Sequence, residues 1–403
     1  MWTLKKLVFR CAHLAMGFAL KRIKVPTPDL ISGPGSVHQL SDAIQKTTAT
    51  NLLLVTDKGI SNIGLADNLQ QDLNNTNLGC TVFDEVQPNP SIDNVEAGLQ
   101  VYLAEKCDGI VAFGGGSAMD CAKLIGARAT NPDKSVLDMS GSFKVTNTLP
   151  PLFAVPTTAG TGSECTLAAV ITNPEKREKF AIASDKIVPA YAVLDPELMV
   201  SLPPNITAHT GMDALTHAIE AYIGKAGSPF TNENAERAIR IIFENLESVF
   251  KDGTDLSKRN DLAYASYCAG LAFTRALVGY VHAIAHNLGG LYGVPHGLAN
   301  AIVLPYILDF SRDHCEEKLA RLAVVGGLGR QTESSRDLSL KFIEKVRSMN
   351  ENMGIPSQVT EMQPSDIPLI ARRALAEGNP GYPVPRLMNQ AQCEALLHQM
   401  VKR

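Results

Sequence analysis

Residues 109–120 read Gly-Ile-Val-Ala-Phe-Gly-Gly-Gly-Ser-Ala-Met-Asp. The pattern predicts a buried strand, a turn on three consecutive glycines, and a helix that opens at Ser117. Glycine lets the backbone turn tightly and approach a phosphate, and the free N–H groups at a helix N-terminus attract negative charge. The stretch therefore predicts a pyrophosphate site, with a tight strand–helix connection as the alternative.

The glycine turn differs from two well-known phosphate-binding patterns. It lacks the Gly-x-Gly-x-x-Gly of the Rossmann motif and the Gly-Lys-Ser/Thr that ends a P-loop. Asp57 ends an earlier strand candidate, whereas the Rossmann order places the acidic residue after the glycines. A second polar loop, Pro-Thr-Thr-Ala-Gly-Thr-Gly-Ser-Glu at 156–164, also follows a strand. The two loops favour a dinucleotide site in a different strand order.

Outward from the glycine turn, short apolar runs alternate with helical patterns, as in βαβ units with a parallel sheet. The strands expected are 52–55, 81–86, 109–113, 152–155, 168–171 and 192–194. After Pro203 and Pro204 the strand signals nearly vanish. The helices expected there are 207–222, 232–250, 261–274, 281–291, 316–325 and 338–349. We predict an N-terminal extension at 1–24, an α/β domain at 25–203 and an all-helical domain at 204–403.

Composition excludes several classes of protein. Hydrophobic residues make up 45% of the 403 residues and charged residues 19%, which predicts a compact chain with a large core. A net charge of −4 gives no electrostatic case for nucleic acid. No membrane span is expected from the sequence. The 8 cysteines are scattered without a Cys-x-x-Cys pair, which favours reduced thiols and the cytoplasm.

The extension at 1–24 is basic, because the first acidic residue of the chain is Asp29. Its apolar residues recur at helical spacing. They are Leu4, Leu7, Val8, Cys11, Leu14 and Phe18. Three interpretations stay open: a plain helical extension, a basic amphipathic helix that touches a membrane or a partner, and a targeting presequence, for which no clear cleavage site follows.

Five of the nine histidines lie between residues 209 and 296. Asp213 and His217 stand at i and i+4, which places both on one face of a helix, and His282 and His286 repeat this spacing. Imidazole and carboxylate ligands without cysteine suit Zn²⁺ or Fe²⁺. Spacing alone favours these four residues as ligands. His209 is a further candidate on the face of Asp213, and ordinary core histidines are the alternative.

The glycine turn, the Pro-Thr-Thr loop, the Gly-Met-Asp-Ala-Leu-Thr-His-Ala-Ile-Glu helix and the His-x-x-x-His…Pro-His-Gly segment occur in the order typical of iron-containing (group III) alcohol dehydrogenases, which the sequence resembles over roughly 25–385. The resemblance implies a dehydroquinate synthase-like architecture. An α/β dinucleotide-binding domain precedes an all-α metal-binding domain, with the active site in the cleft between them. It also implies a homodimer or larger homo-oligomer.

The resemblance also implies roles for individual residues. The metal ligands become Asp213, His217, His282 and His296, and His286 becomes a catalytic residue that handles a proton near the nicotinamide. The cofactor-binding residues implied are Asp57, Asn89, Gly115, Gly116, Ser117, Asp120, Thr157, Thr158, Thr161, Thr166 and Lys179. The C-terminal Asn-Pro-Gly-Tyr-Pro-Val-Pro-Arg segment at 379–386 matches the family only loosely.

The function expected is reversible hydride transfer between a small alcohol or aldehyde and NAD(H), with Fe²⁺, or alternatively Zn²⁺, as the metal. Rivals are a zinc polyol dehydrogenase, an NADPH-dependent aldehyde reductase, a dehydroquinate-synthase-like lyase, and a non-enzymatic nucleotide- or metal-binding regulatory module. NAD is expected over NADP because Asp57 would repel a 2′-phosphate, while Lys58 should point to the other side of an extended chain. The sequence identifies neither the physiological alcohol nor the native metal.

Overall fold

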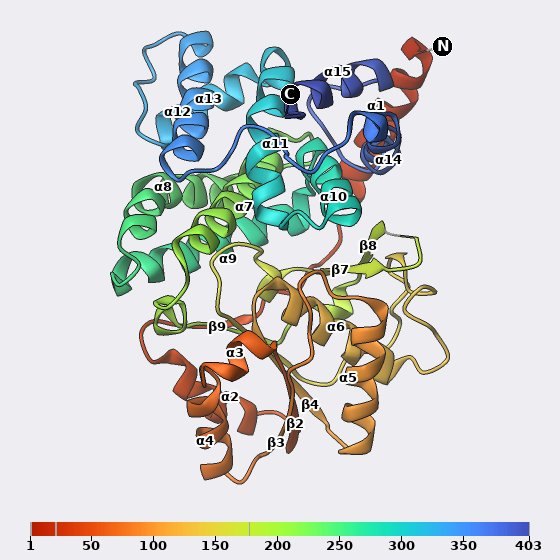
Figure 1. Cartoon of the computed structure of the whole chain (residues 1–403), viewed down its shortest axis with the longest axis vertical. Helices are drawn as coiled ribbons and strands as arrows, with labels where there is room; N and C mark the ends of the chain where they lie inside the picture. The colour runs from red at the N-terminus through yellow and green to blue at the C-terminus, as the bar shows by residue number, and fades with distance from the viewer. Residues whose placement is uncertain (1, 21, 177, 403) are drawn as a thin grey trace. The chain divides into compact units, whose positions relative to one another are not determined.

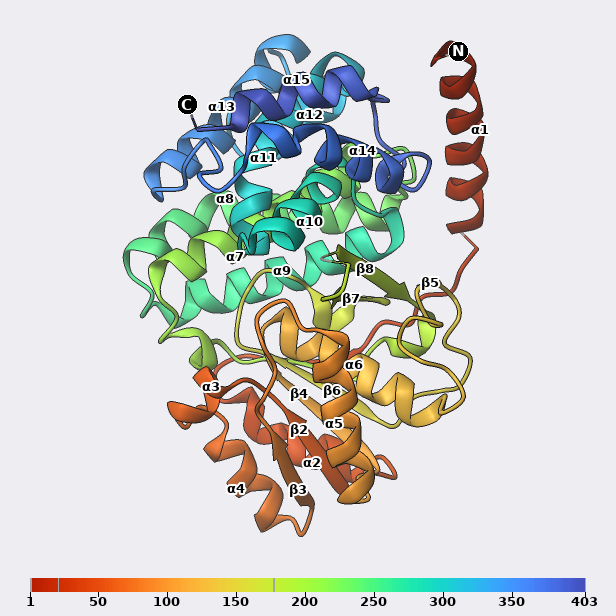
Figure 2. The same ribbon diagram turned by 45° about the vertical axis from the view of Figure 1, so that its right-hand side comes forward.

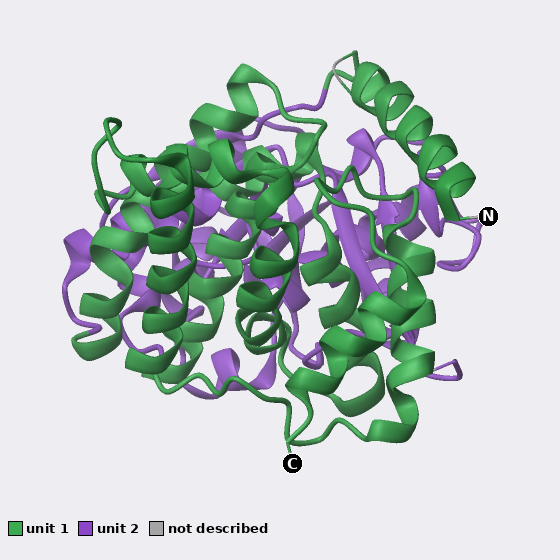
Figure 3. Ribbon diagram, turned by 90° about the horizontal axis from the view of Figure 1, so that it is seen from above, with its two compact units in different colours: residues 1–24, 203–252, 268–403 green, residues 25–202, 253–267 purple. Residues whose placement is uncertain are grey.

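The computed structural model describes residues 2–20, 22–176 and 178–402. The chain forms two compact units (Figure 3). The α/β unit comprises residues 25–202 and 253–267, and the helical unit comprises residues 1–24, 203–252 and 268–403. Two segments therefore lie in a unit other than the one that a linear division at residues 24 and 203 would give them. The N-terminal segment belongs to the helical unit, and the segment at 253–267 belongs to the α/β unit.

The α/β unit contains a six-stranded sheet with the order β1-β9-β6-β4-β2-β3. Strands β2, β3, β4 and β9 of this sheet are labelled in Figure 1. All of its strand pairs are parallel. The strands are β1 (Asp29–Ser32), β2 (Asn51–Val55), β3 (Gly79–Phe83), β4 (Gly109–Gly114), β6 (Leu152–Pro156) and β9 (Tyr191–Leu194). Every residue of β4 and β6 is buried, which accounts for their continuous apolar sequence.

Helices cover both faces of this sheet. They are α2 (Leu40–Gln45), α3 (Lys58–Asn62), α4 (Asp67–Asn75), α5 (Ile92–Ala104) and α6 (Gly116–Thr130). Alternate residues of a strand point to opposite faces. Leu53 therefore packs in one core with Leu124 of α6, whereas Leu52 and Leu54 pack in the other with Leu69 of α4. The predicted α/β architecture with a parallel sheet is confirmed.

A separate three-stranded sheet has the order β5-β8-β7. It consists of β5 (Gly141–Ser142), β7 (Ala168–Asn173) and β8 (Glu178–Ala183). The strand expected at 168–171 therefore does not join the parallel sheet, but pairs antiparallel with β8. The sequence pattern missed β1 and β8, because β1 is largely exposed, β8 is only partly buried, and neither forms a continuous apolar run.

The described part of the helical unit contains helices and no named strand. The helices are α1 (Trp2–Leu20), α7 (Pro204–Ile223), α8 (Pro229–Lys251), α10 (Tyr280–Tyr292), α11 (His296–Ser311), α12 (Glu316–Val325), α13 (Ser335–Asn352), α14 (Ile367–Gly378) and α15 (Gln390–Met400), while α9 (Leu256–Ala276) begins in the α/β unit. The sequence pattern missed α11, which contains Pro305 and is apolar on nearly all sides.

Among the described helices, none is by itself both long and apolar enough to cross a bilayer. The consecutive helices α9 and α10 meet that test only when taken together, and they are bent by 104° relative to each other.

Candidate metal centre and cofactor loops

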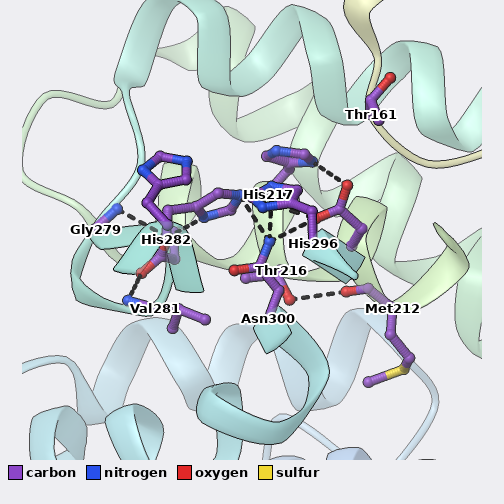
Figure 4. Close-up of polar contacts among 12 residues, drawn as sticks. Thr161, Met212, Thr216, His217, Gly279, Val281, His282, His296 and Asn300 are labelled. Carbon is purple, nitrogen blue, oxygen red and sulfur yellow. Dashed lines mark hydrogen bonds and ion pairs between the residues drawn. The ribbon is translucent and has the colours of Figure 1, made fainter. Parts of the chain in front are cut away.

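Three helices of the helical unit bring four potential metal ligands together (Figure 4). Asp213 and His217 come from α7, His282 from α10, and His296 from the first position of α11. One ligand atom from each side chain lies within 4.8 Å of the others, and all but His296 are buried. The i, i+4 spacing accounts for the first two residues, whereas helix packing brings the other two to them.

The packing of α11 against α7 requires the glycine of the Pro-His-Gly segment. A Cβ atom on Gly297 would lie 2.3 Å from the backbone carbonyl oxygen of His209. Only glycine therefore lets α11 approach α7 closely enough to leave His296 Nε2 3.5 Å from Asp213 Oδ1. His209 is thus in contact with α11 through its backbone, and its side chain is not among the four that converge.

A buried carboxylate orients His282. The Nδ1 atom of His282 lies 2.7 Å from Glu220 Oε2. The backbone N–H groups of Gly279 and Val281 each donate to the same carboxylate at 2.8 Å. Burial raises the pKa of Glu220 to about 7 and lowers the pKa of His282 well below its usual value. A hydrogen bond from Nδ1 to Glu220 leaves the Nε2 lone pair of a neutral imidazole facing the cluster.

Asn300 supplies the clearest test of whether the cluster fits a cation. Its amide Nδ2 atom lies 2.6 Å from Asp213 Oδ1, 3.1 Å from His296 Nε2 and 3.2 Å from His282 Nε2. An amide nitrogen carries two hydrogens, so it satisfies at most two of these three acceptors at once. Three potential ligand atoms, Asp213 Oδ1, His282 Nε2 and His296 Nε2, thus converge around this one amide group. This arrangement, with one carboxylate and three imidazoles, fits a divalent ion such as Fe²⁺ or Zn²⁺.

His286 lies one helical turn after His282 but points to a different partner. Its Nδ1 atom is 2.7 Å from Glu377 Oε1, and the Tyr382 hydroxyl donates to the same oxygen at 2.6 Å. Burial alone would raise the pKa of Glu377, but the charge and hydrogen bond of His286 bring it below its usual value. The His286 ring stacks on that of His296 at 5.4 Å. His286 therefore adjoins the cluster, although it is not one of the four residues that converge.

In the α/β unit, the glycine turn and the Pro-Thr-Thr loop follow neighbouring strands, β4 and β6. The backbone N–H of Thr157 donates to the Gly114 carbonyl at 3.0 Å. A Cβ atom on Gly116 would lie 2.6 Å from the Thr161 side chain, and one on Gly115 would lie 3.6 Å from the Thr158 hydroxyl. The two loops therefore pack against each other at the carboxyl edge of the sheet, beside the N-terminus of α6.

Asp57 lies at the same edge of the sheet, but it caps a helix and does not end a strand. The chain's first strand is β1, β2 ends at Val55, and Asp57 caps the short helix α3 by accepting a hydrogen bond from the Ile60 N–H at 3.1 Å. A Cβ atom on Gly114 would lie 3.9 Å from Asp57 Oδ2, so the carboxylate adjoins the glycine turn. Lys58 is the first residue of a helix, so the argument from an extended chain was wrong.

Two further groups of predicted cofactor residues lie within polar networks. The Lys179 ammonium donates to Asn89 Oδ1 at 2.6 Å, and Asn89 has the left-handed φ of 57°. Buried Lys123 donates to the hydroxyls of Thr166 and Ser163, and Ser163 in turn donates to Asp120 at 2.7 Å. Burial lowers the pKa of Lys123 to about 8. These bonds tie the end of the Pro-Thr-Thr loop to α6.

Sequence reasoning missed several residues that support the predicted site residues of the two units. They are Glu220, Asn300, Glu377 and, in the α/β unit, Lys123. The first two carried a usable signal, since Glu220 follows His217 by three residues and Asn300 follows His296 by four, which places each on the face of its helix that bears a ligand candidate. Glu377 carried none, because it lies on another helix, 91 residues from His286.

A parallel α/β unit with a glycine-rich turn, joined in one chain to a buried Asp/His₃ cluster, is typical of metal-dependent dehydrogenases. Comparison with known proteins agrees. Residues 26–196 match the family described as iron-containing alcohol dehydrogenase, and residues 207–401 match the C-terminal domain of the same family. The chain belongs to the iron-containing alcohol dehydrogenase family.

Several relatives have assigned activities. A 1,3-propanediol dehydrogenase of Klebsiella pneumoniae is 41% identical over 371 residues, covering 91% of this chain and 95% of that one. An NAD-dependent methanol dehydrogenase of Bacillus methanolicus is 36% identical over 352 residues, covering 87% of this chain and 92% of that one. Among solved structures, a 1,3-propanediol oxidoreductase is 40% identical, has a TM-score of 0.90, and covers 94% of this chain and 99% of that one.

Family membership confirms the activity expected from the sequence. The chain is a metal-dependent oxidoreductase that transfers hydride between an alcohol and NAD.

Proposed function

We propose that Asp213, His217, His282 and His296 hold the family's divalent metal, which supplies Lewis acidity towards the substrate oxygen. The observation that carries this assignment is the convergence of four ligand atoms within 4.8 Å. Three neutral imidazoles and one carboxylate would leave a charge of about +1 on a divalent ion, which would favour negative charge on the substrate oxygen. Glu220 keeps His282 in the orientation that faces the ion.

The cofactor is held in this proposal by the two loops at the edge of the sheet. The turn at 115–117 offers backbone N–H groups at the start of α6 to the pyrophosphate. The hydroxyls of Thr157, Thr158 and Thr161 line the neighbouring loop. Asp57 accepts hydrogen bonds from the adenosine ribose, and its place beside the glycine turn supports this role. Asn89 and Lys179 act as a hydrogen-bonded pair, and Asp120 and Thr166 act through the Lys123 network.

His286 is the catalytic residue of the proposal. Its Nδ1 atom is engaged by Glu377, so its Nε2 atom is left to accept the proton that leaves the alcohol, directly or through a cofactor hydroxyl. Glu377, which also accepts a hydrogen bond from the Tyr382 hydroxyl, fixes the orientation of the ring. This arrangement separates the proton carrier from the four metal ligands, although His286 and His282 are on the same helix.

The substrate proposed is a small primary alcohol or diol, or the corresponding aldehyde, as the names of the Klebsiella and Bacillus relatives suggest. The proposed compartment is the cytoplasm, supported by eight free cysteines, of which six are buried. The proposed assembly is a homodimer or larger homo-oligomer, which light scattering of the purified chain measures directly.

The decisive experiment starts with metal-free protein. NADH formation is measured with methanol, 1,3-propanediol, glycerol and other polyols after Fe²⁺ or Zn²⁺ is added, in parallel with NADP. We expect metal-dependent oxidation of the small primary alcohols with NAD. Turnover confined to polyols with zinc would favour the polyol dehydrogenase, and preference for NADPH and aldehyde would favour the aldehyde reductase. No turnover with any substrate would contradict the proposed catalytic assignments.

A further inference from the structure

The N-terminal helix α1 lies along the edge of the helical unit (Figure 2), and one of its faces contacts that unit. The Arg10 guanidinium donates to the backbone carbonyls of Val384 and Pro385 at 2.6 and 2.7 Å. His13 is only 2% exposed, and Gly17 is buried, with room for a Cβ atom at an ordinary contact distance of 3.8 Å from Ala226 Cα. Arg10, His13 and Gly17 follow one another at i, i+3 and i+7, so they form one face of the helix. This face fixes α1 to its own unit.

The other face of α1 carries an exposed apolar stripe. Its large residues are Leu4, Leu7, Val8, Leu14 and Phe18, with exposed fractions of 67%, 62%, 57%, 76% and 62%. Exposed Cys11 lies among them. The spacing of 3, 4 and 7 residues aligns these side chains along a single side of the helix. Contiguous exposed apolar patches on a folded protein mark interaction surfaces.

The charge around the stripe indicates what covers it. Lys5 and Lys6 are exposed in the first turns of α1, and Arg22 and Lys24 are exposed just after it. The Arg22 guanidinium lies 3.4 Å from the centre of the Phe18 ring, at the end of the stripe. No acidic residue precedes Asp29, although the whole chain carries a net charge of −4. Positive charge is thus concentrated on α1, against the sign of the protein as a whole.

We propose that α1 binds the surface of an anionic lipid bilayer. The leucine and phenylalanine side chains of the stripe enter the boundary between headgroups and acyl chains, and the lysines and arginines contact anionic headgroups. A second copy of the chain fits less well, because a symmetric contact through this stripe would bring the same basic residues of two helices together. The Arg10, His13 and Gly17 contacts hold the helix against the folded protein while the stripe faces the membrane.

The test uses the full chain and sedimentation with vesicles of pure phosphatidylcholine or of phosphatidylcholine with phosphatidylglycerol. We expect the chain to partition at least tenfold more strongly onto the anionic vesicles, and salt to weaken this binding. The double variant Leu7→Glu/Leu14→Glu should lose at least tenfold in partitioning, while kcat in solution is unchanged. Lys5→Glu/Lys6→Glu should lose the preference for anionic vesicles. Leu340→Glu, at another exposed apolar position on α13, is the matched control and should bind as the natural chain does.

Three results would overturn the proposal. The first is equal or absent sedimentation with both kinds of vesicle. The second is a mass measured by light scattering that falls in the Leu7→Glu/Leu14→Glu variant while vesicle binding is unchanged, which would assign the stripe to a contact between copies. The third is a mature protein from the native cell that begins after α1 by mass spectrometry, which would assign the helix to a targeting sequence.

Discussion

The residues proposed to hold the metal and those proposed to hold the cofactor are built differently. The metal cluster consists of side chains from three helices, oriented by buried partners such as Glu220 and Asn300. The cofactor loops consist largely of glycine backbone and threonine hydroxyls at the ends of two adjacent strands. In the first region the chemistry resides in a few irreplaceable side chains. In the second it resides largely in backbone N–H groups and threonine hydroxyls, to which the Asp57 carboxylate is added.

The largest effect expected concerns His296 and His286, which stack on each other but differ in role. His296→Ala should abolish stoichiometric metal binding and, with it, activity. His286→Ala should keep the metal but lower kcat by ~10²–10⁴-fold, because a general base is lost. Metal analysis by mass spectrometry and steady-state kinetics measure both effects. The reverse pattern would assign the metal ligand to His286 and break the distinction between the two residues.

The second prediction sharpens the description of the cofactor loops. Asp57→Asn keeps an acceptor for the Ile60 N–H but removes the charge. At ~4 Å the repulsion of a 2′-phosphate is about 4 kcal/mol at an effective dielectric constant near 20, so even partial relief should raise kcat/KM for NADP by ~10–100-fold. Asp57→Gly should do the same and also lower kcat/KM for NAD. If the natural chain already uses NADP as well as NAD, Asp57 does not face the ribose.

The third prediction compares two pairs of glutamate and histidine, one buried and one partly buried, each joined at 2.7 Å. Glu220→Gln should weaken metal binding by ~10–100-fold, because it disturbs the orientation of a ligand. Glu377→Gln, the matched control, should leave metal affinity unchanged and lower kcat. Competition with a chelator measures the first and turnover the second. Equal metal affinity in both variants would remove Glu220 from the metal centre.

The smallest effect expected concerns a segment that belongs to neither region. Deletion of α1 should leave kcat within about threefold, since exposed termini tolerate truncation and α1 supplies none of the proposed site residues. Solubility and vesicle binding should change instead. A ~100-fold loss of kcat in a chain whose circular dichroism is unchanged would show that α1 contributes to catalysis, in contrast to the ordinary tolerance of chain ends.

The sequence predicted the elements whose signals are local. The apolar runs of β2, β4 and β6 predict buried parallel strands, and the helical spacing of apolar residues predicts α7, α10 and α12. The spacing of Asp213 and His217 places both on one face of a helix whatever surrounds it. The order of the motifs was sufficient to identify the family and therefore the activity, which the comparisons confirm.

Only the tertiary structure decided which distant residues meet. Spacing favoured His286 over His296, but the close approach of α11 to α7 at Gly297 brings His296 beside Asp213, while Glu377 engages His286. The antiparallel pairing of β7 with β8 and the place of Asp57 as a helix cap were likewise absent from the sequence pattern. Periodicity records only which face of an element is buried, whereas contacts between elements depend on backbone approach, and a single missing Cβ atom can determine that approach.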